Sequence, residues 1–438
     1  MSFPQAGDGR IHPLSYEQQT LLALEMARPE AFFSPTFTLQ VDVALEGPLD
    51  VELLRAALAD VVARHSALRT RLALDAAGDL VQEEFPRPEG AALLEEVSAL
   101  SADRLSVPPF EPPLIRAALE RSGPDRHQLR LAIHHAACDA TGLFVALRDL
   151  ALAYSARVEG GRLPPLEMGY GDYARWQAEG SAEALRAGAE FWRRYLADFP
   201  PYEVRSDLPF TPGAVSGREV RAEVLAPDEL AGLARFATRA RSTPLVVLLT
   251  AFHLALSDRT SSEHRLAITL FDQRDHPAAR TMVGFFTRPA LVRSRLDPAR
   301  PLTSALEEAT RSCMEAYRHA YVPASLGLAQ FPPLVPSLFG EAPPWCFVVQ
   351  YLPGNEPVEL SFGAARGRVL KSGVNMGQEP GFSLRLRRDP AGALQGRAGY
   401  DPTQWQEPTM QRLLARLGAA ARELVADSSR TPPTVHEA

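Results

Sequence analysis

The stretch that most constrains the fold of this chain runs from Leu129 to Leu147 and reads LRLAIHHAACDATGLFVAL. Its first part alternates leucine and isoleucine with other residues, a pattern typical of a strand, and its last part repeats apolar residues at helical spacing. His134 and His135 therefore stand at the end of a predicted strand. Asp139 stands at the turn before a helix, where an aspartate caps the helix or joins an ion pair.

Side chains alternate across a strand, so His134 and His135 cannot both face one cavity, and only one of them can do chemistry there. Asp139 lies four residues beyond His135, round a turn, and its carboxylate either fixes the loop or contacts the imidazole. Taken alone, the pattern favours two packed or solvated histidines over a catalytic centre. Cys138 invites a nucleophile interpretation, but we favour packing as a small apolar group in a tight loop.

Composition narrows the class of protein. A chain of 438 residues is long enough for two or three domains, and 46% hydrophobic with 23% charged residues is ordinary for a globular protein. The net charge of −7 argues against nucleic acid as the main partner and fits a soluble cytoplasmic enzyme. The three cysteines are widely spaced without a CxxC pair, so we expect neither a disulfide framework nor a metal site.

No targeting or membrane segment is predicted. The N-terminus has no basic region followed by an apolar run, so we expect no signal peptide. The longest apolar run, Leu245–Leu256, is too short to span a bilayer and contains His253, which predicts a buried helix and no membrane association.

Strand and helix patterns alternate in both halves of the chain, which is typical of the α/β class. A capping box at Ser15 starts a first helix, and Asp50 caps a second. A proline-rich stretch before Gly213 predicts a linker. We therefore divide the chain into an N-terminal lobe at 1–176, a helix and inter-lobe linker at 177–213, and a C-terminal lobe at 214–438. Further strands are predicted at 115–119, 218–225, 266–271, 291–296, 346–351, 382–386 and 394–400.

Five segments together carry a family resemblance. The histidine stretch is similar to an HHxxxDG motif, and the other segments are similar to an opening motif and to RHxxLRTxF, YxDYAxW and IGxFVNT. They are Leu14–Gln19, Arg64–Leu72 (RHSALRTRL), Tyr170–Trp176 (YGDYARW) and Met282–Thr287 (MVGFFT), with Arg274 upstream of the last where Gly-Arg is common. In this order, over about residues 12 to 425, they resemble the condensation domains of nonribosomal peptide synthetases, within the chloramphenicol acetyltransferase-like superfamily.

This resemblance implies an α/β fold of two chloramphenicol acetyltransferase-like lobes in a V-shaped pseudo-dimer, with mixed sheets flanked by helices and a channel between the lobes. It implies transfer of an acyl group from a phosphopantetheine thioester on an acyl or peptidyl carrier protein to a small-molecule amine or alcohol. The product is an amide or an ester in nonribosomal peptide or polyketide biosynthesis, a source of antibiotics. Because the sequence shows no adenylation motif and no carrier serine motif, we expect a free-standing monomer whose carrier binds in trans and brings the phosphopantetheine, with no bound cofactor.

The motif implies that His135 is the catalytic histidine, with His134 beside it, and that Asp139 forms an ion pair with Arg274. For an amine acceptor the histidine need only position the nucleophile and take a proton late. A hydroxyl acceptor depends more strongly on a general base.

Other residues are candidates for the oxyanion site and the channel. Backbone amides of Thr141 and Gly142, at the start of the following helix, could stabilise an oxyanion. Gln350, Asn375 and Ser383 are polar residues in segments that could line the channel, with ordinary loop or strand polarity as the alternative.

The chain departs from the family motifs at two points. Ala140 replaces the glycine of HHxxxDG, which matters if that backbone must be left-handed, although Gly142 follows two residues later. The last motif segment ends in Phe286-Thr287-Arg288 where the family motif has Val-Asn-Thr. Arg288 is interpreted as a solvated loop residue, with a contact to an acidic acceptor or carrier group as the alternative. Arg64 and Arg69 are candidates for buried ion pairs, although surface positions are more usual for arginine.

Two alternative functions stay open. One is an acyl-CoA-dependent, ester-forming acyltransferase of the polyketide-associated or wax-ester type. The other is a catalytically inactive carrier-docking platform, which Ala140 supports and the joint presence of His135 and Asp139 opposes. The HRxxxDD pattern of recruitment-only relatives is absent, as is the double aspartate of heterocyclisation domains.

Overall fold

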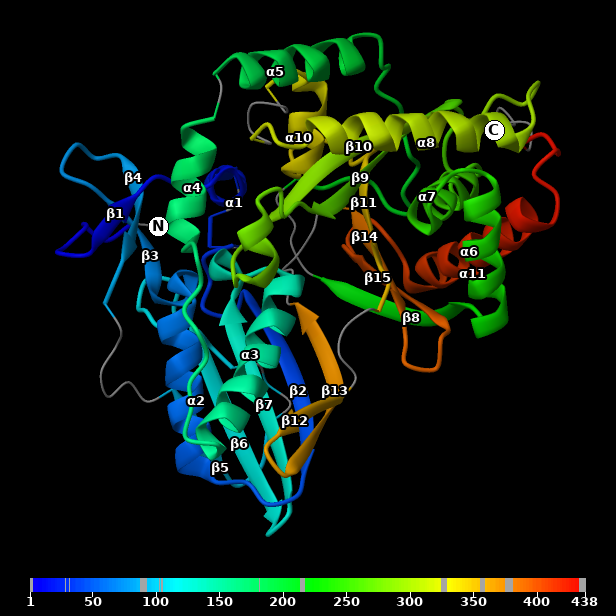
Figure 1. Ribbon diagram of the computed structural model, residues 1–438. Coiled ribbons are helices and arrows are strands. Elements are labelled where there is room, and N and C mark those ends of the chain that lie inside the picture. Colours follow the sequence, from blue (N-terminus) through cyan, green and yellow to red (C-terminus); the bar gives the residue numbers. More distant parts are fainter. Residues whose placement is uncertain are drawn as a thin grey trace. The chain divides into compact units, whose positions relative to one another are not determined.

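A computed structural model describes residues 3–27, 29–30, 32–86, 93–101, 103, 105–180, 182–212, 217–323, 329–354, 359–374 and 381–432. The chain forms two compact units, each assembled from three segments (Figure 1). Unit 1 comprises Met1–Ser181, Asp272–Thr287 and Glu356–Gly377, and unit 2 comprises Ala182–Phe271, Arg288–Asn355 and Gln378–Ala438.

The observed division differs from the three consecutive ranges drawn from the sequence. The first change of unit falls at 181/182, and the helix inside the predicted linker range belongs to unit 2. Two segments of the C-terminal half return to unit 1. Strand pairing over such sequence distances leaves no local pattern, which is why a reading of composition and periodicity does not show it.

Unit 1 is built on a six-stranded sheet in the order β12-β13-β2-β7-β6-β5. In this sheet β2, β6, β7 and β13 pair antiparallel, and β5 pairs parallel with β6. A separate sheet has the order β1-β4-β3. The strands are β1 Arg10–His12, β2 Thr38–Glu46, β3 Thr70–Leu74, β4 Leu80–Glu84, β5 Leu94–Val97, β6 Ile115–Gly123, β7 Arg126–His134, β12 Glu359–Phe362 and β13 Ala365–Val374.

Two helices cover the main sheet of unit 1, as Figure 1 shows for α2 and α3. The predicted cap at Asp50 is present, because its Oδ1 accepts the amides of Glu52 at 2.9 Å and Leu53 at 3.1 Å. The apolar stripe of α2 is buried with α3 and the sheet in one core, where each large aliphatic side chain contributes about 1.5–3 kcal/mol. The helices are α1 Tyr16–Ala27, α2 Val51–Arg64, α3 Ala140–Val158 and α4 Tyr170–Ala178, with 3₁₀ turns η1 Ser66–Arg69, η2 His135–Ala137 and η3 Pro277–Thr281.

Unit 2 is built on a six-stranded sheet in the order β10-β9-β11-β14-β15-β8. Its strands are β8 Arg218–Leu225, β9 His264–Asp272, β10 Thr287–Arg295, β11 Phe347–Leu352, β14 Phe382–Arg388 and β15 Leu394–Tyr400. Its helices are α5 Ala182–Ala197, α6 Pro227–Arg239, α7 Pro244–Ala255, α8 Leu302–His319, α10 Val335–Leu338 and α11 Glu407–Ala426, with η4 at Pro332–Leu334. The apolar run that predicted a buried helix forms α7, and its His253 has no exposed surface.

Both six-stranded sheets contain parallel and antiparallel pairs and carry helices, so the predicted class, α/β with mixed sheets, is confirmed. The two units also repeat one order of elements. In unit 1 the order is β2, α2, then the hairpin β6–β7, then α3; in unit 2 it is β8, α6, then the hairpin β14–β15, then α11.

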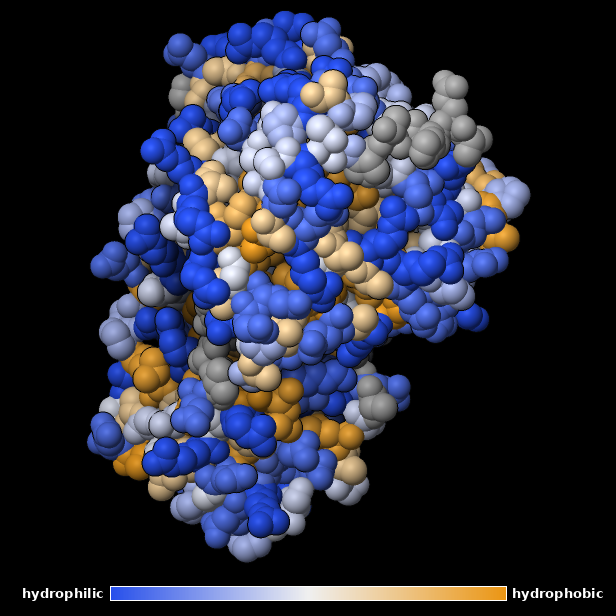
Figure 2. Space-filling view, turned by 90° about the vertical axis from the view of Figure 1, so that its right-hand side faces the viewer, coloured by the Kyte–Doolittle hydropathy of each residue, from blue (hydrophilic) through white to orange (hydrophobic). Residues whose placement is uncertain are grey.

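Hydrophilic residues predominate on the face of the molecule drawn in Figure 2, with hydrophobic residues scattered among them in small groups. Within the described ranges, every helix is too short or too polar to span a bilayer.

Candidate functional site

His134 ends β7 and is fully buried. Its Nε2–H donates to the carbonyl of Ser34 at 3.1 Å, and its Nδ1 accepts the amide of Ala136 at 3.1 Å. Burial lowers the pKa of His134 to about 4, so the ring is neutral at neutral pH. Both ring nitrogens are therefore committed to backbone groups, and the geometry gives His134 a structural place beside the turn.

His135 starts the 3₁₀ turn η2 and is half-buried. Its Nδ1 lies 2.7 Å from the carbonyl oxygen of Cys138. Because a carbonyl oxygen can only accept, Nδ1 carries the proton, and in the neutral ring the lone pair then lies on Nε2. The ring stacks on Phe37 with centroids 4.8 Å apart and meets the edge of Phe285 at 5.3 Å.

Asp139 is the N-cap of α3 and is 1% exposed. Its Oδ1 accepts the amide of Gly142 at 2.7 Å and lies 2.7 Å from Nη2 of Arg274. Its Oδ2 accepts the amide of Phe286 at 2.9 Å, and its own amide donates to the carbonyl of Gly284 at 3.0 Å. The carboxylate thus ties the histidine loop to the segment 272–287.

Arg274 fixes the other side of this connection within unit 1. Its Nη1 donates to the carbonyls of Ala279 at 2.9 Å and Met282 at 3.2 Å, and its guanidinium lies 4.2 Å from the ring centre of Phe286. Burial raises the pKa of the Asp139 carboxyl, and the positive charge of Arg274 opposes that rise.

The arginine-histidine motif at 64–65 binds the same segment from another side. Nδ1 of His65 accepts the amide of Val283 at 3.2 Å, and Nε2 lies 3.0 Å from Oδ2 of Asp149. Arg64 contacts the same carboxylate oxygen at 2.9 Å, and Arg69 pairs with a glutamate of β4 at 2.8 Å. The surface interpretation of these two arginines was therefore wrong, because buried carboxylates lie within their reach. Burial also lowers the pKa of His65.

Tyr170, which begins one of the five motif segments, forms hydrogen bonds to three of the other four. Its hydroxyl donates to the carbonyl of Phe285 at 2.7 Å and lies 2.8 Å from Oγ of Ser15, while its amide donates to Oγ of Ser66 at 2.8 Å. Gly284 packs on its ring so closely that a Cβ there would lie 2.5 Å from a ring carbon. All five motif segments thus meet around the histidine turn.

Comparisons with known proteins identify the family. A family model described as "Condensation domain" matches residues 10–432. The chain belongs to the condensation-domain family. It is 32% identical over 343 residues, 74% of its length, to CymA of Salinispora arenicola, described as a probable non-canonical nonribosomal peptide synthetase, of which it spans 4%.

Solved structures show the same fold. SgcC5 from Streptomyces globisporus is similar with a TM-score of 0.78 and 25% identity over 96% of this chain and 100% of that chain. The X-domain from teicoplanin biosynthesis has a TM-score of 0.76 and 24% identity over the whole of both chains. The fold expected from the motif resemblance is therefore that of the condensation domains.

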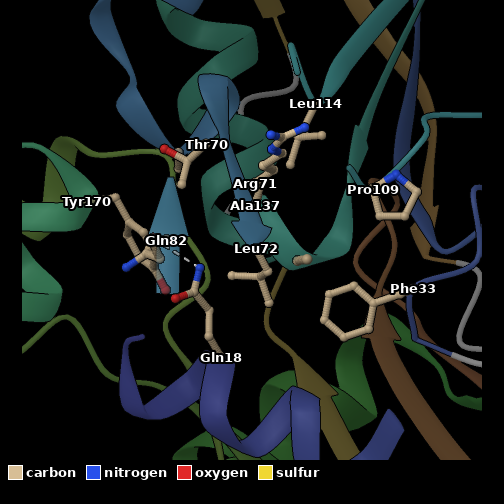
Figure 3. Close-up of a pocket in the computed structure, with 12 residues that line it drawn as sticks. Gln18, Phe33, Thr70, Arg71, Leu72, Gln82, Pro109, Leu114, Ala137 and Tyr170 are labelled. Atoms are coloured by element: carbon tan, nitrogen blue, oxygen red, sulfur yellow. Dashed lines mark hydrogen bonds between the residues drawn. The ribbon is translucent and has the colours of Figure 1, made fainter. Parts of the chain in front are cut away.

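A small pocket lies beside the histidine turn of this condensation domain (Figure 3). It has a volume of about 10 Å³, room for about one water molecule. Figure 3 shows the amides of Gln18 and Gln82, joined at 3.1 Å, on one side, and Phe33 and Pro109 on the other. The remaining lining residues are Ala67, Thr70, Arg71, Leu72, Leu114, Ala136, Ala137 and Tyr170.

The two residues proposed for the oxyanion site differ in their surroundings. The Gly142 amide is already donated to Asp139, so the expectation that it serves an oxyanion was wrong; helix capping uses that donor. Thr141 is exposed beside it. Ala140 is the first residue of α3, and the only non-glycine residues with left-handed φ in the described ranges are Glu30 and Arg241. The alanine therefore sits in ordinary helical backbone.

The channel candidates are not brought to the histidine within unit 1. Gln350 on β11 and Ser383 on β14 belong to unit 2 and share the face of its sheet that is opposite the buried side chains of Phe347 and Leu384. Asn375 lies outside the described residues.

Two further interpretations can be compared with the structure. Arg288 is 4% exposed on β10, so its interpretation as a solvated loop residue was wrong. Cys138 is buried and burial raises the pKa of its thiol, which agrees with packing rather than nucleophilic attack. In the ranges that the structure describes, no three metal-ligating side chains cluster.

Several contacts of the site were absent from the sequence-based prediction. Phe37 lies outside the five motif segments, and the carbonyls of Ser34 and Cys138 that orient the histidines have no sequence signal at all. Backbone acceptors cannot be recognised from residue type, because every residue carries one.

Proposed function

We propose that this condensation domain transfers an acyl group from a carrier-protein phosphopantetheine thioester to an amine or hydroxyl acceptor, with His135 as the general base. The observation that carries the proposal is the hydrogen bond from Nδ1 of His135 to the Cys138 carbonyl, which leaves the lone pair on Nε2. A neutral imidazole with a fixed tautomer is suited to accept a proton near neutral pH. Family membership supports an amide-forming role in nonribosomal peptide synthesis.

In this proposal the acceptor attacks the thioester carbonyl, and a C–N or C–O bond forms as the C–S bond breaks. The proton leaving the acceptor goes to Nε2 of His135 and then to the departing thiolate. The rings of Phe37 and Phe285 beside the imidazole restrict its contact with water, which favours the acceptor over hydrolysis. Asp139 and Arg274 are proposed to hold the loop rather than to exchange protons, because the carboxylate is occupied by Arg274 and two amides.

We further propose that the carrier protein is a separate partner that brings the phosphopantetheine, that the domain needs no cofactor of its own, and that it acts as a cytoplasmic monomer.

Intact-mass detection of a separately supplied, acyl-loaded carrier tests the proposal. Wild type with a panel of amines and alcohols should unload the carrier only when an acceptor is present. His135→Ala should slow this about 10²–10⁴-fold, the usual contribution of a general base. His127→Ala is the control for loss of an imidazole elsewhere, because His127 lies at the far end of β7 and is more deeply buried than His135, at 2% exposed. Retained carrier binding without unloading by any acceptor would favour the docking platform instead.

Ester formation is the second candidate. SgcC5 was crystallised with (R)-(-)-1-(2-naphthyl)-1,2-ethanediol, a vicinal diol that presents hydroxyl groups. If alcohols alone unload the carrier, the product is an ester. Competition between acyl-CoA and the acyl carrier as donors separates the acyl-CoA-dependent alternative from the carrier-dependent one.

The docking platform has less support. A complex of the teicoplanin X-domain with OxyB is known for that protein, whose likeness to this chain concerns the fold. The argument for inactivity here was Ala140, and its backbone is the ordinary start of a helix. The presence of an oriented His135 favours catalysis.

A further inference from the structure

Glu25 stands in the last turn of α1, an unfavourable place for a negative charge because the carbonyl end of the helix dipole is nearby. It is nevertheless only 3% exposed. A buried carboxylate in such a position needs strong donors. The structure supplies them from the loop that follows the helix.

Three backbone amides converge on the Glu25 carboxylate. Its Oε1 accepts from Glu30 at 2.6 Å, and its Oε2 accepts from Phe32 at 2.8 Å and Phe33 at 3.2 Å. Glu30 has a left-handed φ of 66°, a conformation that is strained for a non-glycine residue. Bonds from amides to an ionised carboxylate are among the stronger hydrogen bonds in proteins, and here they offset the backbone strain.

The loop that Glu25 organises is the one that holds both histidines. The Ser34 carbonyl accepts Nε2–H of His134 at 3.1 Å, and the Phe37 carbonyl accepts the amide of His135 at 2.9 Å. The ring of Phe37 then stacks on the His135 imidazole. The Glu25 carboxylate is thus connected to the His135 ring by the amide of Phe32, by the edge contact of the Phe32 ring with Phe37 at 5.3 Å, and by the stacking of Phe37 on the imidazole.

The pocket in Figure 3 lies between the loop anchored by Glu25 and the histidine turn. It is bounded by Ala136 and Ala137 of the histidine turn and by Phe33, whose amide is bonded to Glu25. A cavity of about 10 Å³ beside the turn leaves a gap in the packing on that side. Phe33, in the loop anchored by Glu25, lines the same gap.

We propose that Glu25 is a positioning residue: by holding Glu30 and residues 32–37 it keeps His135 in the orientation in which Nδ1 donates to the Cys138 carbonyl. The inference rests on the proposed role of His135 as general base.

The test compares Glu25→Gln, Glu25→Asp and wild type by carrier unloading and by ¹⁵N NMR of histidine-labelled protein, with His135→Ala assigning the His135 signals. Glutamine has the same shape but replaces one acceptor oxygen with N–H donors. We expect kcat to fall about 10- to 100-fold with KM within about threefold, because misplacing a catalytic group acts on the chemical step. The His135 nitrogen shifts should move from a fixed Nδ1–H tautomer toward a mixture, and aspartate, which keeps the carboxylate, should recover part of both.

Glu17→Gln is the matched control. Glu17 lies on the same helix, is 1% exposed, and accepts from Nε2 of Gln177 at 3.1 and 3.3 Å, on the side of α4. It should lower the melting temperature about as much as Glu25→Gln while leaving the His135 shifts at their wild-type values.

A folded Glu25→Gln protein with wild-type His135 shifts overturns the inference, whatever its melting temperature. The NMR result does not depend on turnover. If wild type unloads no carrier while Glu25→Gln alone displaces the His135 shifts, the proposed function fails and the positioning role stands.

Discussion

Each unit contains an antiparallel hairpin whose second strand leads into a helix, and the loops at these two junctions differ. In unit 1 the junction between β7 and α3 contains His134, His135 and Asp139. In unit 2 the junction between β15 and α11 contains Asp401, whose carboxylate accepts the amide and hydroxyl of Thr403 at 2.9 and 2.7 Å and the side-chain amide of Gln404 at 2.8 Å.

The two aspartates make similar contacts with their backbone amides and different contacts with their carboxylates. The amide of Asp139 donates to Gly284 and that of Asp401 to Gly381, so each loop is pinned to another segment of its own unit. The Asp401 carboxylate then closes only its own loop, beside a Trp405 that is 1% exposed. The Asp139 carboxylate reaches Arg274 and Phe286, which lie 135 and 147 positions later in the chain. One topology thus supports packing at one junction and a polar constellation at the other.

Replacing the two aspartates with alanine should give the largest difference in stability between the two junctions. Asp139→Ala removes the closer of two ion-pair partners of the buried Arg274 guanidinium and leaves it the exposed Asp272, whose Oδ1 lies 3.2 Å from Nε. The amides of Gly142 and Phe286 also lose their acceptor, so we expect a loss of about 3–5 kcal/mol in unfolding free energy together with activity. Asp401→Ala removes only local bonds and should cost about 1–3 kcal/mol. Urea denaturation of both variants measures the difference. An Asp139→Ala protein with wild-type stability and no activity would break the comparison.

Acid should affect the first junction selectively. The folded-state pKa of His134 is about 4, below the ordinary 6.5, so its contribution is fully present above pH 6.5 and is lost as pH falls toward 4. For this group alone the loss at pH 5 is about 2 kcal/mol. His65 and His253, whose pKa values burial also lowers, add to the wild-type slope.

The measurement therefore compares the pH-dependent change in unfolding free energy between a variant and wild type. The change in unfolding free energy between pH 8 and pH 5 should be smaller in His134→Gln than in wild type by about 2 kcal/mol. Thr403→Ala, at the second junction, should keep the wild-type pH dependence. Equal slopes in His134→Gln and wild type would mean that His134 is not held neutral by burial.

Gly142 and Ala140 provide the third comparison, within the first junction itself. A Cβ on Gly142 would lie 2.9 Å from Sγ of Cys138 and 3.1 Å from the carbonyl of Gly284, so Gly142→Ala should cost about 1–3 kcal/mol and reduce activity. The readouts are urea denaturation and carrier unloading.

Ala140→Gly, which restores the letter of the family motif, should have the smallest effect. Glycine at a helical position costs up to about 1 kcal/mol relative to alanine, and no gain in activity is expected. A large gain would show that the backbone at 140 departs from the helical start described for α3.

Local structure was largely readable from the sequence. The cap at Asp50, the buried helix around His253 and the hairpin of β14 and β15 follow from short-range patterns, and all are present. The strands β12 and β13 were not predicted, because β13 pairs with β2, more than 300 positions earlier in the chain, and β12 pairs with β13. Periodicity reports burial along a segment and not the partner that buries it.

The site could be predicted in part for the same reason. Residue types drew attention to His135, Asp139 and Arg274, and the motif resemblance supplied the pairing. The acceptors that set the histidine tautomers are carbonyls of Ser34 and Cys138, and the anchor at Glu25 looks like a surface helix residue in the sequence. Gly142 was a candidate oxyanion donor because it lies at the N-terminus of a helix. Capping by Asp139 uses the same amide, and only the geometry decides between the two uses.

The pairing of β13 with β2 also determines when the main sheet of unit 1 can be completed during synthesis. As the ribosome releases the protein, β2 and β7 emerge early, but the strand that completes their sheet emerges only after most of unit 2 has been synthesised. In the interval the edge of β2 offers unpaired amides and carbonyls to any extended segment nearby. A nascent chain of this domain therefore exposes the unpaired edge of β2 until β13 has been made. A gene fragment that stops at the end of the first segment would expose that edge permanently.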